Sequence, residues 1–171
     1  MANKKKVIVT GFEPFGDHAV NSSWVAVQLA VHVGVSGLAT TVTLEQCGHN
    51  KGYKRLDNCS FCPASHCCME NGPDCINSVL DMDTVCKRVN DSNIGVNVSV
   101  SKDAGRYLCD YTYYTSLFLG HGCSAFVHVP PLGKPYSSQD LGRALQAIIQ
   151  EMLNLLQLNP ADKEHNHKHQ Q

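Results

Sequence analysis

A cysteine near the start of a predicted helix is the first candidate for chemistry in this chain. Cys109 lies in residues 103–114 (DAGRYLCDYTYY), after a β-like run at 96–101 and a turn at 103–105. A helix N-terminus presents unpaired N–H groups and the positive end of the dipole, which favour a thiolate and can hold an oxyanion. The segment therefore predicts a reactive thiol, although a buried, inert cysteine is the simpler interpretation.

A histidine and a carboxylate stand where they could assist that thiol. His128 lies at the end of a short predicted strand, 125–129 (AFVHV), and Glu45 follows the apolar run 31–35. Carboxyl ends of parallel strands share one edge of a sheet, where α/β proteins bind ligands, so we expect both side chains to meet Cys109 there. A thiol, an imidazole and a carboxylate together suit nucleophilic acyl transfer.

Other residues compete for two of these roles. His49 and His121 are alternatives for the base, and Asp103 and Asp110 are alternatives for the acid. Taken singly, a histidine in a strand is more often part of the core, and a glutamate in a loop is more often solvated. The hypothesis of a Cys/His/acid enzyme therefore depends on the joint placement of the residues.

An aromatic loop near the N-terminus could bind a small ligand. Residues 6–10 (KVIVT) read as a buried parallel strand, and the loop TGFEPFG follows, with Phe12 and Phe15. The two rings could wall an apolar pocket at the end of the sheet, or they could cap the core.

Strands and helices alternate along the chain, which predicts an α/β fold. Helices are predicted from Asn21, at 74–89, at 107–117, and from Ser138 as the cap to about residue 158. We expect a three-layer α/β/α sandwich with a twisted, mostly parallel but mixed sheet. Residues 1–158 would form a single domain, followed by a polar, disordered tail at 159–171.

Composition excludes several classes of function. A net charge of −1 argues against nucleic acid or an acidic membrane surface as partner, and 43% hydrophobic residues describe a globular protein. No apolar run is long enough to span a membrane, and the N-terminal lysines precede too short an apolar stretch for a signal peptide. The sequence thus predicts a cytosolic protein.

Nine cysteines need a separate explanation in a reducing compartment. Cys59 and Cys62 form a C-x-x-C pair, with Cys67 and Cys68 close behind, so a zinc-stabilised cysteine-rich module is one hypothesis. Adjacent cysteines are poorly placed to bind one tetrahedral ion, which favours reduced thiols instead.

Several motifs closely resemble the pyroglutamyl-peptidase I family of cysteine peptidases in its vertebrate form. They are TGFEPFG, TTVTLEQCGHNKGYKRLDNCSFCP, DAGRYLCDYTYY, FVHVPPLGKPY and QDLGRALQAI, and the resemblance spans about residues 5–156. It implies a cytosolic enzyme, without a cofactor and expected to be a monomer, that removes N-terminal pyroglutamyl residues from peptides. By this resemblance Cys109 is the nucleophile, His128 the base and Glu45 the orienting acid, and Phe12 and Phe15 flank the lactam ring.

The chain departs from the family pattern at one junction. Gln28, Leu29 and Ala30 join the first predicted helix directly to the strand VHVGV, with no turn residues between them. The resemblance implies that roughly one αβ unit, on the order of 30–40 residues, is missing here. One alternative is therefore a catalytically impaired variant of the same fold, with a binding or regulatory role or none.

Overall fold

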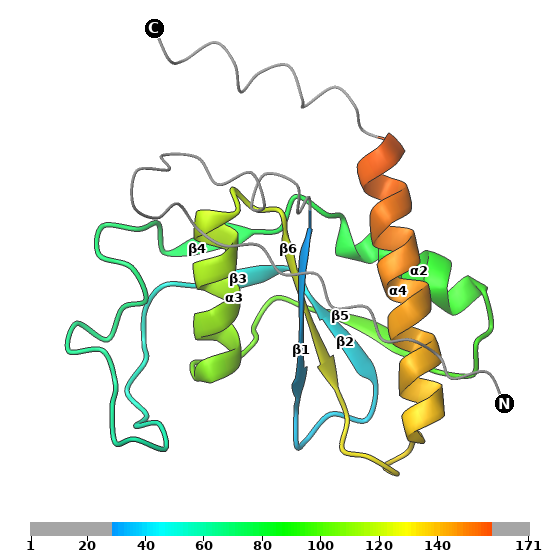
Figure 1. Ribbon diagram of the computed structural model, residues 1–171, viewed down its shortest axis with the longest axis horizontal. Helices are drawn as coiled ribbons and strands as arrows, with labels where there is room; N and C mark the ends of the chain where they lie inside the picture. Colours follow the sequence, from blue (N-terminus) through cyan, green and yellow to red (C-terminus); the bar gives the residue numbers. More distant parts are fainter. Residues whose placement is uncertain (1–28, 159–171) are drawn as a thin grey trace, which may run out of the picture.

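A four-stranded mixed sheet lies at the centre of the computed structural model, which describes residues 29–158 (Figure 1). The strand order is β1-β6-β2-β5. Strand β6 (Ser124–Val129) pairs in parallel with β1 (Ala30–Val35) and antiparallel with β2 (Val42–Glu45). Strand β5 (Val98–Ser101) then pairs in parallel with β2. Strands β1, β5 and β6 confirm those predicted at 31–35, 96–101 and 125–129, with small shifts of their ends, whereas β2 was not predicted.

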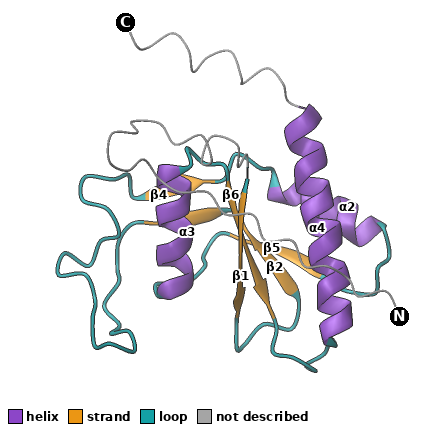
Figure 2. Ribbon diagram, in the orientation of Figure 1, coloured by secondary structure: helices purple, strands orange, loops and turns teal. Residues whose placement is uncertain are grey.

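Within residues 29–158, helices cover both faces of the sheet, as Figures 1 and 2 show. Helix α3 (Leu108–Leu119) lies on one face, and α2 (Met82–Asp91) and α4 (Ser138–Leu158) lie on the other. All six residues of β6 are buried, because this strand has a partner on each side and helices above and below it. The predicted three-layer α/β/α class is confirmed.

The larger core lies between the sheet and the helices α2 and α4. Helix α4 presents one apolar stripe at helical spacing, and α2 packs beside it with a second stripe. The fully buried members on these two helices are Met82, Val85, Val89, Ala144, Ile148 and Met152. They meet Val42, Leu44 and Val127 of the sheet. A smaller cluster on the opposite face joins α3 to β6 through Tyr113, Leu117 and Phe126.

A short two-stranded sheet corrects one predicted helix. Residues 74–89 do not form one continuous helix, because β4 (Cys75–Asn77) pairs antiparallel with β3 (Cys47–His49). Helix α2 begins only at Met82, where Asp81 caps it by accepting hydrogen bonds from the backbone N–H groups of Asp83 and Thr84. Pairing with a strand far away in the sequence outweighed the local helical spacing of the apolar residues.

The cap of α4 is a second correction. Ser137, rather than Ser138, accepts a hydrogen bond from the Asp140 backbone N–H, and the Asp140 carboxylate accepts from Ser137 in return. This reciprocal pair is a capping box, so Ser138 becomes the first residue of the helix.

Several predictions fall on residues that the structure does not describe. These are the strand 6–10, the loop with Phe12 and Phe15, the helix from Asn21, and the tail 159–171. None of the helices within residues 29–158 combines the length and apolar character needed to cross a membrane.

Candidate active site

A buried histidine–carboxylate pair lies on the α3 side of the sheet. His128 Nδ1 is 2.8 Å from Glu45 Oε1, and both side chains are almost wholly excluded from solvent. A carboxylate can only accept, so Nδ1 carries the proton and Nε2 is left with a free lone pair. The pair thus has the tautomer and the orientation of a general base held by an acid.

Antiparallel pairing of β2 and β6 brings these two side chains together. Glu45 lies opposite Phe126 and Thr43 lies opposite His128, so Glu45 and His128 are diagonal neighbours on the same face. The prediction that Glu45 and His128 meet at the shared edge of parallel strands is wrong, because β2 runs antiparallel to β6. The reversed direction of β2 carries the carboxylate back alongside β6 and leaves it buried.

Cys109 reaches the same face of the sheet from the second residue of α3. A Cβ added to Gly34 would lie 3.1 Å from Cys109 Sγ and 2.8 Å from Phe126 Cζ. Gly34 is paired with His128 in the parallel ladder of β1 and β6, so the thiol lies close to the strand position beside the histidine. No hydrogen bond joins Cys109 to His128 in the described part of the chain.

The helix N-terminus does not produce a low pKa for Cys109. Burial raises the pKa of this thiol, and the nearby carboxylates of Glu45 and Asp110 raise it further by disfavouring a second negative charge. The predicted thiolate, favoured by the helix dipole, is therefore wrong for the free protein. Within this half-buried site, desolvation and two carboxylates raise the pKa of the thiol instead.

Alkylation of Cys109 should therefore require a higher pH in the folded protein than in the unfolded chain. The raised pKa keeps the thiol protonated at neutral pH, and only the thiolate reacts. Iodoacetamide labelling at a series of pH values, read at the Cys109 peptide by mass spectrometry with and without urea, measures the difference. Glu45→Gln removes one carboxylate and should move the folded profile to lower pH. A folded profile below the unfolded one would contradict the prediction.

A cavity of about 410 Å³ opens beside the histidine–carboxylate pair. Glu45 and His128 line it, together with Val35 and Ser36 from the end of β1 and the loop 103–105 that leads into α3. Cys109 does not line this cavity, although Leu108, directly before it, lines a separate cavity of about 230 Å³. The first cavity is large enough for a small, flat ligand next to the base.

Two residues of the site escaped the sequence analysis. Gly34 creates the space that Cys109 and Phe126 occupy, and Tyr113 donates its buried hydroxyl to the backbone carbonyl of Glu45 at 2.8 Å. This hydrogen bond links α3 to the end of β2 and helps to set the position of the helix relative to the Glu45 carboxylate. The only signal in the sequence was the unusual run of tyrosines in a helical segment.

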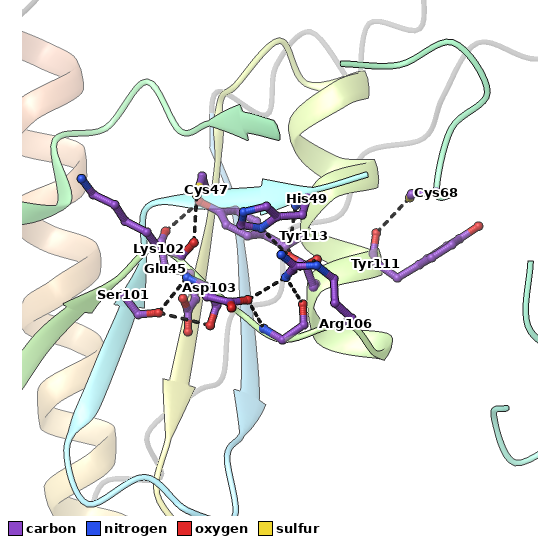
Figure 3. Close-up of polar contacts among 12 residues, drawn as sticks. Glu45, Cys47, His49, Cys68, Ser101, Lys102, Asp103, Arg106, Tyr111 and Tyr113 are labelled. Atoms are coloured by element: carbon purple, nitrogen blue, oxygen red, sulfur yellow. Dashed lines mark hydrogen bonds and ion pairs between the residues drawn. The ribbon is translucent and has the colours of Figure 1, made fainter. Parts of the chain in front are cut away.

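The alternative bases and acids lie elsewhere. His121 is exposed in the turn after α3, and Asp103 is exposed and paired with Arg106 at 2.6 Å (Figure 3). His49 and Asp110 form a second histidine–carboxylate contact, with Nδ1 and Oδ1 3.8 Å apart. Asp110 is fully buried and also accepts the Tyr53 hydroxyl at 2.9 Å, and burial raises its pKa.

The four cysteines considered for zinc do not converge. Cys59 is exposed, whereas Cys68 is buried with its Sγ 3.0 Å from the Thr115 hydroxyl. Within residues 29–158, potential ligand atoms gather in threes only at Cys47, His49 and Cys75. The hypothesis of a zinc site at Cys59, Cys62, Cys67 and Cys68 is therefore wrong.

The chain is similar in sequence and in structure to known proteins. A family model described as pyroglutamyl peptidase matches residues 26–144. Pyroglutamyl-peptidase 1 of Homo sapiens is 54% identical, covering 97% of this chain and 98% of the human protein, and the enzyme of Rattus norvegicus is 55% identical, covering 93% and 95%. The solved pyrrolidone carboxyl peptidase of Thermococcus litoralis superposes with a TM-score of 0.69 at 18% identity, covering 77% of this chain and 68% of that one.

The alignment with the human protein also shows that this chain is shorter than its relative. The alignment with the human protein spans 205 positions, whereas this chain has 171 residues, so at least 34 aligned positions have no residue here. A shortfall of this size is that of one αβ unit, as the family resemblance implied. With the matched family model, the near-complete coverage of its relatives and the shared fold, the chain belongs to the pyroglutamyl peptidase family.

Proposed function

We propose that this protein is a cysteine peptidase that removes N-terminal pyroglutamyl residues from peptides. The observation that carries the proposal is the buried Glu45–His128 hydrogen bond, with the Cys109 thiol on the same face of the sheet. Membership of the pyroglutamyl peptidase family supplies the substrate class. No cofactor takes part in the proposed reaction.

The proposed reaction has two halves, with His128 moving the proton in each. Nε2 of His128 takes the proton of the Cys109 thiol as Sγ bonds to the carbonyl carbon of the pyroglutamyl residue. The same proton passes to the leaving amine, so the peptide departs and a thioester remains. Water then attacks the thioester while His128 removes its proton, and this proton returns to Sγ as pyroglutamate leaves. Glu45 holds Nδ1–H throughout and stabilises the transient imidazolium.

The geometry of the free protein supports a base-assisted thiol rather than a preformed ion pair. Cys109 makes no hydrogen bond to His128 among the described residues, and burial raises its pKa. Catalytic contacts are often long before the substrate binds and tighten in the complex. A substrate carbonyl between the thiol and the cavity beside His128 would bring the two groups into the same reaction.

We include Phe12 and Phe15 in the proposal as a clamp for the lactam ring, although they lie outside the described residues. Their support is the aromatic loop TGFEPFG and the flat, uncharged character of pyroglutamate. Phe15→Ala should raise KM for a pyroglutamyl substrate by about 10-fold, since lost apolar contact of this size costs about 1–3 kcal/mol. Steady-state kinetics measure the change, and an unchanged KM would remove Phe15 from the clamp.

The decisive experiment measures fluorophore release by the purified full chain. We expect hydrolysis of pyroglutamyl-aminomethylcoumarin and none of prolyl-aminomethylcoumarin, which lacks the lactam carbonyl. Circular dichroism and a thermal melt of the same sample establish that the protein is folded. Folded protein that leaves the pyroglutamyl substrate intact would overturn the proposed activity and favour the non-catalytic variant of the fold.

We further propose that residues 1–158 act as one domain despite the missing unit, which we place at the Leu29–Ala30 junction. Support comes from the continuous core shared by the sheet, α2 and α4. A single cooperative thermal transition, with equal calorimetric and van't Hoff enthalpies, is the expected result. A broad, non-cooperative melt would show that the shortened chain does not complete the fold.

The proposal places the protein in the cytosol as a monomer. All nine cysteines are free thiols in the structure, as expected for a reducing compartment. The proposed nucleophile, base and acid all come from one chain, so the reaction needs no second subunit. Cell fractionation and light scattering test these two points.

A further inference from the structure

The small sheet of β3 and β4 gathers three metal-ligating side chains outside the proposed active site. In the antiparallel register His49 lies opposite Cys75, and Cys47 lies opposite Asn77. Alternation along a strand puts Cys47, His49 and Cys75 on one side of this sheet. One potential ligand atom from each lies within 4.8 Å of the other two.

We propose that Cys47, His49 and Cys75 bind one Zn²⁺ ion. Two thiolates and one imidazole are a soft donor set that zinc prefers, and a water molecule can complete the tetrahedron. With bonds of about 2.3 Å to sulfur and about 2.0 Å to nitrogen, the donor atoms of such a site lie about 3.5–3.8 Å apart. The present separations of up to 4.8 Å would have to shorten by about 1 Å, through rotation of the side chains about their own bonds, when the ion binds.

Asp110 stands where it would orient the imidazole of a zinc-bound His49. Its Oδ1 accepts the backbone N–H of His49 at 3.2 Å and lies 3.8 Å from Nδ1, which is buried without a hydrogen-bond partner among the described residues. In the proposed site Nε2 binds the ion and Nδ1–H is directed at this carboxylate. Histidine ligands of zinc commonly have such a carboxylate behind them.

Asp110 is itself held in place. It accepts the Tyr53 hydroxyl at 2.9 Å and lies 3.5 Å from Arg106 Nη1. Figure 3 shows His49 between Cys47, on the same strand, and Arg106. The orienting carboxylate therefore belongs to a fixed network rather than to a mobile surface side chain.

A zinc ion can reach the proposed site from solvent, and its binding replaces one existing hydrogen bond of Cys47. Cys75 is exposed and the His49 side chain is 24% exposed, whereas Cys47 is buried. The Cys47 thiol now donates to the Lys102 carbonyl at 3.2 Å, and this bond is exchanged for the bond to zinc (Figure 3). Each thiol loses its proton on binding, so one Zn²⁺ enters and two protons leave.

The experiment uses the full chain carrying Cys109→Ala, which removes the proposed nucleophile as a competing ligand. Zn²⁺ is measured by equilibrium dialysis, and Co²⁺ is titrated as a spectroscopic probe. We expect one ion per chain, a near-ultraviolet thiolate-to-cobalt charge-transfer band, and a higher Tm with zinc. None of these readouts involves hydrolysis. An absence of zinc binding would therefore leave the proposed peptidase activity untouched, and an absence of peptidase activity would leave the proposed zinc site untouched.

Matched cysteine variants decide where the ion binds. Cys75→Ser, at an exposed position that should tolerate the change, should weaken zinc binding at least about 10-fold and abolish the charge-transfer band and the rise in Tm. Cys62→Ser, in the neighbouring C-x-x-C pair, should leave all three readouts unchanged. The proposal is overturned if the parent chain binds no zinc, if Cys75→Ser binds as the parent does, or if Cys62→Ser is the variant that loses the ion.

Discussion

Cys109→Ala is expected to abolish hydrolysis of pyroglutamyl-aminomethylcoumarin, with kcat/KM lower by about 10⁴-fold or more. Alanine keeps the start of α3 intact but removes the Sγ atom that forms the proposed thioester. His128 and Glu45 would retain their hydrogen bond, since neither depends on the thiol for a partner. Steady-state kinetics, with the protein concentration taken from ultraviolet absorbance, gives the remaining rate.

Cys86→Ala is the matched control for this prediction. Cys86 is also a partly buried thiol, but it lies in α2 on the opposite face of the sheet and donates to the Val98 carbonyl. Its removal should leave kcat/KM within a factor of about two while costing about 0.5–1.5 kcal/mol for the lost hydrogen bond. If Cys109→Ala retains more than about a tenth of the activity, Cys109 is not the nucleophile.

Gly34→Ala is expected to damage both stability and catalysis. The added methyl group would lie 2.8 Å from Phe126 Cζ, 3.0 Å from its Cε1 and 3.1 Å from Cys109 Sγ. Phe126 cannot move aside freely, because its ring packs against Tyr113, His128 and His32, with centroids 5.8, 4.8 and 6.1 Å away. Overpacking of this kind costs about 1–3 kcal/mol of unfolding free energy.

The catalytic effect of Gly34→Ala follows from the same contacts. If the thiol shifts by about 1 Å relative to His128, kcat should fall by about 10²-fold while KM changes less. Thermal unfolding and steady-state kinetics of one preparation separate the two effects, because the assay temperature can be kept well below Tm.

Gly37→Ala provides the matched control, three residues further along the chain. A Cβ at Gly37 would meet nothing within 4 Å, so the change should leave kcat and Tm almost unchanged. A second substitution tests whether the clash with Phe126 causes the loss of stability. Phe126→Leu in the Gly34→Ala background makes room for the methyl group and should recover part of the stability. Equal stability of Gly34→Ala and the parent would mean that Cys109 and Phe126 do not pack against Gly34.

Local patterns predicted most of the elements that carry the site. The apolar residues of β6 and the helical spacing in α4 are signals set by neighbours a few positions apart, so the sequence displays them directly. The reading of 74–89 as one helix failed because the pairing of β4 with β3 depends on residues about 30 positions away. Such contacts leave no local periodic signal.

Residue types and local patterns define the chemical groups: a thiol at the start of a helix, a histidine near the end of a buried strand, a carboxylate after another strand, and motifs of one family. Which of these side chains meet depends on how the segments pack in the folded chain. The reversed direction of β2 joins Glu45 to His128, the absent side chain of Gly34 admits Cys109, and the β3–β4 register gathers Cys47, His49 and Cys75. Residue types and periodicity are local properties, whereas strand direction and register are set by packing between segments distant in the chain.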